Sequence, residues 1–312
     1  MKTIKPLKNK WGTMRLLIKP LTSRVRLYQN TLIAILFAGT VVQSGAQIYP
    51  LSAQDSSVQI NLAGGVSDWT IDGVNQLNQQ WFYYSVGSGP VYSIDTIAPW
   101  STPTISHGST PSLTETYANS TISVKTQYIL QGQASGSGMA TLGDAITINN
   151  PSATAQTYHF YQYSDFYLGG VSGGQYVQFN SNGAGTAYQV IQTGLTGATL
   201  TGTVTALSGG TSVSPEEQAG IYDGTMFGLV NGNPAPLLNN TLNAGPGNVV
   251  YAYEWDVTLA ASGNPGSSLT ISEIQAVVPE PSSVALVASG MLVLALLYRR
   301  RQGGQRIAIL FK

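Results

Sequence analysis

Residues 249–260 of the chain read VVYAYEWDVTLA. Large apolar and aromatic residues occupy every second position from Val249 to Leu259, and mostly small or polar residues stand between them. Successive side chains of a β-strand point to opposite faces, so this pattern predicts a strand with one buried face and one solvated face. Glu254 and Asp256 fall on the solvated face, with Cβ atoms about 7 Å apart.

The same two-residue alternation recurs through residues 47–276, whereas a helical apolar period does not run for long. Clusters of glycine and asparagine separate the alternating stretches, as turns between strands require. About nine to twelve strands spaced in this way predict an all-β domain, an antiparallel β-sandwich. The predicted strands beside 249–260 lie at 58–63, 80–86, 120–131, 145–149, 157–163, 187–192, 198–207 and 269–274.

One short helix is expected at residues 214–218. Ser214 suits the capping position, Pro215 suits the first helical position, and Glu216 and Glu217 suit the positive end of the helix dipole. Adjacent helical residues point about 100° apart, so we do not expect the two glutamates to act as an acid/base pair.

Charge is segregated along the 312-residue chain, although the formal net charge is zero. Of fourteen basic residues, eight precede residue 31 and five follow residue 298, which leaves Lys125 alone in the middle. The middle carries thirteen acidic residues. Nucleic-acid binding needs clustered Lys and Arg to neutralise phosphates, so this composition excludes it. The chain has no cysteine, which excludes disulfides and thiolate metal sites.

The N-terminus predicts a secretory signal peptide over residues 1–46, helical in its apolar part. Positive charge precedes an uncharged stretch at 31–42, and small residues at Ser44 and Ala46 match the signal-peptidase preference. We therefore expect cleavage between Ala46 and Gln47. An uncleaved membrane anchor is the alternative, although the apolar stretch is short for a span. Whether translation starts at Met1 or Met14 does not change this prediction.

The C-terminus holds a second targeting pattern. Pro279, Glu280 and Pro281 are followed at once by 17 uncharged residues, 282–298. A helix of this length spans about 25 Å, which is enough to cross a thin hydrocarbon core. The sequence therefore predicts a single transmembrane helix directly after the Pro-Glu-Pro turn.

An arginine cluster, Arg299, Arg300 and Arg301, follows this predicted span. Under the positive-inside rule the cluster stays in the cytoplasm, so we expect the domain on the opposite side of the inner membrane. Residues 302–312 would then form a short cytoplasmic tail.

In residues 277–301, the Pro-Glu-Pro turn, the short span and the arginine cluster together resemble the PEP-CTERM sorting domain of Gram-negative envelope proteins. The resemblance implies that an integral-membrane processing enzyme, exosortase, recognises Pro279, Glu280 and Pro281. It further implies that the chain is cut there and passed to the envelope or exported, often in species that make exopolysaccharide. Family members usually end soon after the arginines, so the effect of the tail on processing stays open. A plain C-terminal anchor is the alternative.

A second resemblance concerns the body, residues 47–276. The stretches SDWTIDG at 67–73, QWFYY at 80–84 and YSDFYLG at 163–169 look like a recurring PEP-CTERM ectodomain of an uncharacterised type. This resemblance implies no particular activity.

Candidate chemical groups in the body are sparse. Glu254 and Asp256 share a strand face at a separation that retaining glycosidases also use, but a solvated sheet face accounts for them equally well. A Ca²⁺ site in predicted loops is the one cofactor left open, because hard oxygen ligands suit that ion; its candidate ligands are Asp68, Asp72 and Asp165. The two histidines, His107 and His159, have no evident Ser or Asp partner pattern, so no catalytic residue is predicted.

Aromatic residues are dense at 81–84 and 158–167, where we expect core packing rather than exposed platforms for sugar rings. Four threonines alternate along the strand at 198–207, which is typical of a wet sheet face, with binding of ordered water as the alternative. They are Thr199, Thr201, Thr203 and Thr205.

The sequence therefore predicts a non-enzymatic secreted or cell-envelope protein, an adhesion or structural module of the surface or of an exopolysaccharide matrix. Its expected partners are exosortase, the membrane and exopolysaccharide. A secreted carbohydrate-active hydrolase is the alternative, and a pocket with two convergent carboxylates would favour it.

Overall fold

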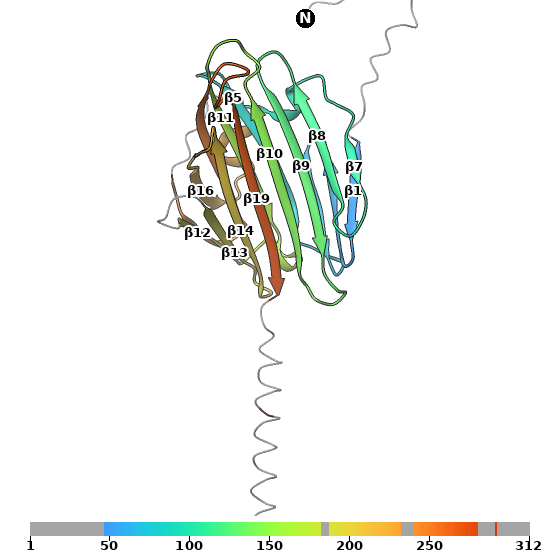
Figure 1. The fold of residues 1–312 in the computed structure, drawn as a ribbon. Helices are drawn as coiled ribbons and strands as arrows, with labels where there is room; N and C mark the ends of the chain where they lie inside the picture. The colour runs from blue at the N-terminus through green and yellow to red at the C-terminus, as the bar shows by residue number, and fades with distance from the viewer. Residues whose placement is uncertain (1–46, 182–186, 232–239, 280–290, 292–312) are drawn as a thin grey trace, which may run out of the picture. The chain divides into compact units, whose positions relative to one another are not determined.

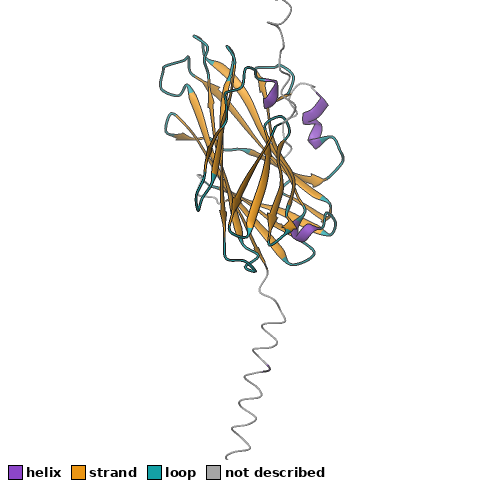
Figure 2. Ribbon diagram, turned by 90° about the vertical axis from the view of Figure 1, so that its right-hand side faces the viewer, coloured by secondary structure: helices purple, strands orange, loops and turns teal. Residues whose placement is uncertain are grey.

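The computed structural model describes residues 47–181, 187–231, 240–279 and 291. In this part of the chain two antiparallel sheets pack face to face, which confirms the predicted all-β sandwich (Figures 1 and 2). Several predicted features lie outside the described residues: the signal peptide with Ala46, the residues Glu280 and Pro281, the span, the arginines Arg299, Arg300 and Arg301, and the tail 302–312. None of the helices within the described ranges has the length and apolar character needed to cross a membrane.

The first sheet has nine strands. Short strands β4 (Val74–Asn75) and β6 (Tyr92–Ser93) pair beside β3 and β5. The main order is β1 (Ile48–Ala53), β2 (Ser56–Asn61), β3 (Gly65–Ile71), β5 (Leu77–Val86), β11 (Gln156–Phe166), β18 (Val249–Leu259) and β16 (Glu216–Ile221).

The second sheet has ten strands, and Figure 1 shows its members β19, β10 and β9 side by side. β15 (Thr211–Ser212) pairs beside β14. The main order is β17 (Asn243–Gly247), β12 (Gln175–Ser181), β13 (Tyr188–Thr193), β14 (Ala198–Ser208), β19 (Ser268–Pro279), β10 (Ala140–Asn149), β9 (Ser123–Gly132), β8 (Ser112–Ala118) and β7 (Thr104–Ser106). Three short 3₁₀ helices lie outside the strands (Figure 2). They are η1 (Ile94–Thr96), η2 (Leu168–Gly170) and η3 (Met226–Asn231).

Every strand predicted from alternation overlaps a strand of the structure. The threonine row lies along β14, where each threonine is half-buried and the residues between, such as Leu200 and Val204, are buried. The row is therefore the outer side of the second sheet, as expected.

The predicted helix at 214–218 is wrong. Glu216 and Glu217 begin β16, an edge strand that pairs with β18 from Glu216↔Glu254 to Ile221↔Val249. Pairing with a long neighbour satisfies the backbone groups that a helix would have satisfied internally, so tertiary pairing overrides the local capping signal.

The prediction of one wet face on β18 is also wrong in part. Ala252 and Glu254 are fully buried, although both alternate with the core residues of this strand. At Ala252 the outer face is covered by η3: the Phe227 ring lies 6.2 Å from the Tyr163 ring, and Tyr163 stands opposite Ala252.

Aromatic rings form the centre of the sandwich. Phe82 of β5 stacks on Phe160 of β11 at 5.8 Å and on Tyr128 of β9, in the other sheet, at 6.5 Å. Trp255 of β18 continues the cluster, 6.4 Å from Phe160. All four are buried, which confirms the expectation of core packing for these rings and joins the two sheets through large apolar contacts.

A buried polar layer crosses the same core. Asp144 of β10 and Glu273 of β19 stand directly opposite each other in register and point into the sandwich. Gln80 donates to Asp144, Gln162 donates to Glu273, and Gln275 donates to Glu273 at 3.1 Å. Burial raises the pKa of Asp144 to about 7. Burial, with a further contribution from the charge of Asp144, raises the pKa of Glu273 to about 8.

These two carboxyls predict a stability that falls as pH rises. Between about pH 4.5 and pH 8 the folded chain holds protons that the unfolded chain has lost, so the free energy of unfolding declines by at most about 1.4 kcal/mol per pH unit for each extra proton. We expect a lower melting temperature at pH 8.5 than at pH 5. Thermal denaturation over this range measures it.

The double variant Asp144→Asn with Glu273→Gln should make this slope shallower, and the remaining slope comes from other buried carboxyls, such as Glu217 and Asp165. Asp72→Asn is the control, because backbone donors from Gly136 and Gly138 lower the pKa of Asp72, so folding does not add a proton to this carboxyl over the measured range. A double variant that keeps the wild-type slope would contradict the assignment.

The two sheets approach each other closely where the end of β9 meets β1, and this contact gives a second prediction. A Cβ added to Gly132, at the end of β9, would lie 1.8 Å from the carbonyl oxygen of Ala53 in β1. Gly132→Ala should therefore cost about 1–3 kcal/mol of unfolding free energy, measured by chemical denaturation. Gly173→Ala is the matched control, because nothing lies within 4 Å of its added Cβ. Equal stability of the two variants would contradict the prediction, because it would show that β9 and β1 can move apart at Gly132 and Ala53 without cost.

Candidate functional site

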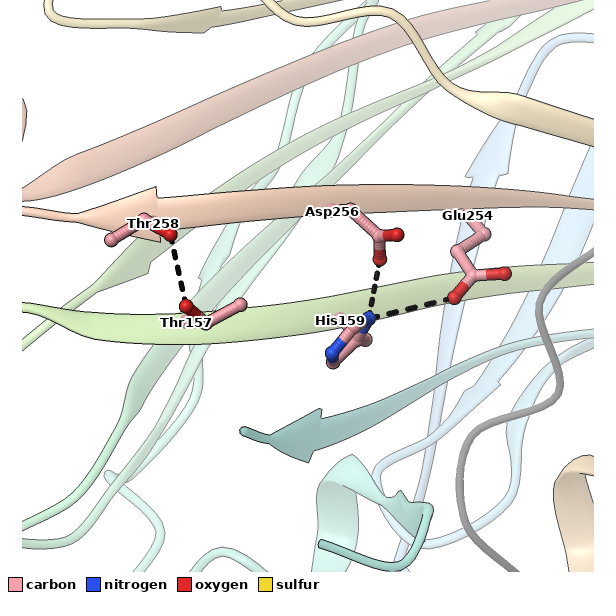
Figure 3. Close-up of polar contacts among 5 residues, drawn as sticks. All are labelled: Thr157, His159, Glu254, Asp256 and Thr258. Carbon is pink, nitrogen blue, oxygen red and sulfur yellow. Dashed lines mark hydrogen bonds and ion pairs between the residues drawn. The ribbon is translucent and has the colours of Figure 1, made fainter. Parts of the chain in front are cut away.

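A histidine and two carboxylates meet on the outer face of the first sheet. His159 of β11 stands opposite Asp256 of β18, and its Nδ1 lies 2.5 Å from Oδ1 of Asp256. The same Nδ1 lies 3.7 Å from Oε1 of Glu254, two residues along β18 (Figure 3). This confirms that Glu254 and Asp256 share a face, and it supplies a partner for His159 that the sequence did not indicate.

The three side chains differ in exposure. Glu254 is 0% exposed, the His159 side chain 19% and the Asp256 side chain 39%. Solvent therefore does not reach the cluster at Glu254, whereas it does reach the cluster at Asp256. One ligand atom from each residue lies within 4.8 Å of the others, and this is the one such group of histidine and acidic residues in the described ranges.

Residues of the same two strands flank this cluster on both sides. In the next row of the same face, the hydroxyls of Thr157 and Thr258 lie 2.9 Å apart (Figure 3). Tyr161 stands opposite Glu254 across the β11–β18 pair. Burial, and after it the charge of Glu254, raises the pKa of the Tyr161 phenol.

A separate cleft of about 460 Å³ opens over β5. Its lining includes Trp81 and Tyr83 of β5, Tyr92 and Ser93 of β6, and Asp95 of η1. Trp81 Nε1 donates to Ser93 Oγ at 2.5 Å, and Ser93 donates in turn to Asp95. Tyr92 is 47% exposed, whereas Trp81 and Tyr83 are buried.

The η3 segment closes the cleft on another side through Met226, Leu229 and Val230. The Tyr83 hydroxyl contacts Met226 Sδ at 3.1 Å. Burial, and then the charge of Asp95, raises the pKa of Tyr83 to about 12. The cleft thus combines a largely apolar lining with one carboxylate.

The aspartates considered for calcium have different partners. Asp68 accepts from Asn75 at 3.2 Å, and Asp72 accepts from the backbone of Gly136 and Gly138. Asp165 lies in β11 rather than in the predicted loop; it is buried and accepts from Asn78 at 2.8 Å. Its burial raises its pKa to about 6. The three do not form a common ligand set within the described part of the chain.

The remaining residues singled out in the sequence do not form a site together. Glu217 points into the sandwich, and burial raises its pKa to about 7, whereas Glu216 is half-buried on the other face of β16. His107 is exposed just after β7. Gln47 is exposed, immediately before β1 begins at Ile48.

Solved structures to which the chain is similar include a bacterial glucoamylase complexed with acarbose, at 10% identity and a TM-score of 0.48, over 80% of this chain and 36% of the glucoamylase. A putative aldose 1-epimerase from Escherichia coli K12 aligns at 11% identity and a TM-score of 0.38, over 75% and 100% of the two chains. A galactose mutarotase related enzyme from Lactobacillus acidophilus aligns at 8% identity and a TM-score of 0.41, over 76% and 98%.

This chain thus spans about a third of the glucoamylase. At these identities the likenesses assign no function. No curated protein matches the chain in sequence.

The C-terminal segment does match a known sequence family. Residues 277–301 match the family described as the PEP-CTERM protein-sorting motif, which confirms the predicted resemblance. The match begins inside β19 and includes Pro279, the last residue of that strand. The chain therefore carries a PEP-CTERM protein-sorting motif, and this motif implies processing by exosortase.

Proposed function

We propose that the chain is a non-enzymatic protein of the cell envelope or extracellular matrix, delivered by exosortase and associated with exopolysaccharide. The observation that carries this proposal is the position of the sorting motif at the end of β19. This strand lies inside the second sheet and pairs with β10 and β14 as far as Val277 and Pro279. A cut within the Pro-Glu-Pro turn would leave every described strand in place, so the sandwich leaves the membrane folded.

The cleft over β5 supports a binding role. The exposed ring of Tyr92 offers an apolar face on which a sugar ring can stack, and Ser93 and Asp95 offer polar groups beside it. A glycosidase needs two carboxyl groups on either side of the scissile bond. Asp95 is the only carboxylate in the lining of this cleft, which favours binding without hydrolysis.

The charge of the body favours a neutral polysaccharide. Between residues 47 and 278 the chain has thirteen acidic residues and Lys125 as the only basic one. An acidic polymer would be repelled by this surface unless a divalent cation bridged the two.

A secreted carbohydrate-active hydrolase is the second candidate. The observation in its favour is the pair Glu254 and Asp256 on one face beside His159. Against it, Glu254 is fully buried, and neither carboxylate lines the cleft. A glycosidase acid must reach the glycosidic oxygen, so we favour the binding role.

Exosortase processing gives the first test. In a host with exosortase, mass spectrometry of the mature chain should find a C-terminus near Glu280, in the envelope or secreted fraction. The variant Glu280→Ala with Pro281→Ala leaves β19 intact and should retain Lys312. Ser282→Ala with Ser283→Ala is the neighbouring control and should be processed. An intact Lys312 in the wild type would leave only membrane anchoring.

Glycan binding gives the second test. On an array of neutral oligosaccharides, Tyr92→Ala should weaken binding about 2–10-fold, because a lost stacking contact costs about 0.5–1.5 kcal/mol. Tyr176→Ala is the matched control, since Tyr176 is 54% exposed on β12 of the other sheet. Equal loss in both variants, or no binding by the wild type, would contradict the cleft as the site. Release of reducing ends from the array ligands would support the hydrolase instead.

A further inference from the structure

We propose that His159, Glu254 and Asp256 form a binding site for one divalent transition-metal ion of the Zn²⁺ class. The proposal is independent of exosortase delivery and of the cleft, because these residues lie on β11 and β18 and do not line the cleft.

The spacing of His159 and Glu254 suits a shared metal ion, and Asp256 would have to move outward to join them. Zinc binds imidazole nitrogen and carboxylate oxygen at about 2.0–2.2 Å, so tetrahedral ligands stand about 3.3–3.6 Å from each other. His159 Nδ1 and Glu254 Oε1 are 3.7 Å apart. The 2.5 Å separation of Nδ1 from Asp256 Oδ1 is shorter than a shared ion allows. Asp256 has room to swing outward by the required distance because its side chain is 39% exposed.

The ligand types favour zinc over calcium. One imidazole nitrogen with two carboxylates is a donor set of Zn²⁺ and its first-row neighbours, whereas Ca²⁺ takes six to eight oxygens. Three protein ligands would leave one of four tetrahedral positions for a water molecule. The two carboxylates match the double charge of the ion. Lys125, on β9 of the other sheet, is the only Lys or Arg among the described residues, so no ammonium or guanidinium on this face competes for the carboxylates.

The scaffold keeps the ligands together. β11 and β18 pair in unbroken register from Gln156↔Leu259 to Ser164↔Tyr251, with the ligand residues in the interior of this ladder. Tyr161 lies beside Glu254 on the same face, in the position of an outer-shell group that orients a metal-binding carboxylate. A site on paired strands holds its geometry better than a site on loops.

Metal binding by the full-length chain tests the proposal. After removal of metal by a chelator, titration calorimetry with ZnCl₂ should show one ion per chain, with a Kd in the micromolar range or tighter. His159→Gln and Asp256→Asn should each weaken binding at least tenfold. His107→Gln is the matched control, because it removes the only other imidazole of the chain and should leave binding unchanged.

The effect of Zn²⁺ on the melting temperature distinguishes a variant that has lost the metal site from one that is merely less stable. Zn²⁺ should raise the melting temperature of the wild type and of His107→Gln relative to the chelated protein, and it should not raise that of His159→Gln. The exposed variants are used because replacement of the buried Glu254 would disturb packing as well. The proposal is overturned if the wild type shows no saturable Zn²⁺ binding, or if His159→Gln binds as His107→Gln does.

Discussion

The register of β11 between β5 and β18 fixes which side chains enter the sandwich and which lie on its outer face. Phe160 points inward to the aromatic core, and His159, its neighbour in the chain, points outward to Asp256. A slip of one residue would exchange these faces, burying the histidine and exposing the ring. The large apolar contacts of the core therefore also hold the polar cluster in place.

The near absence of basic residues in the body shapes its interior. Buried carboxyls such as Asp144 and Glu273 have glutamine amides as donors in place of lysine or arginine. In a low-dielectric core without a cationic partner, a carboxyl is cheapest to bury when it keeps its proton. The polar layer is thus compatible with the sandwich as long as the core retains these protons, and this ties the stability of the domain to the surrounding pH.

The sorting motif and the folded domain overlap in β19. The strand is an interior member of the second sheet, and its last residue, Pro279, is the first residue of the Pro-Glu-Pro sequence. Proline lacks a backbone N–H and suits the end of a strand better than its middle, so the same residue ends the ladder and starts the motif. The body and the signal for its processing therefore share one strand without a linker.

The sequence alone determined the sandwich class, the strongly alternating strands and the sorting motif, because each is written in contiguous residues such as 249–260 and 277–301. It missed several strands, among them β1, β3, β8 and β12. It also made a helix of β16, whose partner residues in β18 lie 28 to 38 positions further along the chain, as the pairs Ile221↔Val249 and Glu216↔Glu254 show. Only the tertiary structure decided that His159 meets Asp256 across 97 residues and that Glu254, on the face expected to be solvated, is buried. Such contacts depend on strand order and register, and these are set by packing of the whole domain rather than by any local pattern.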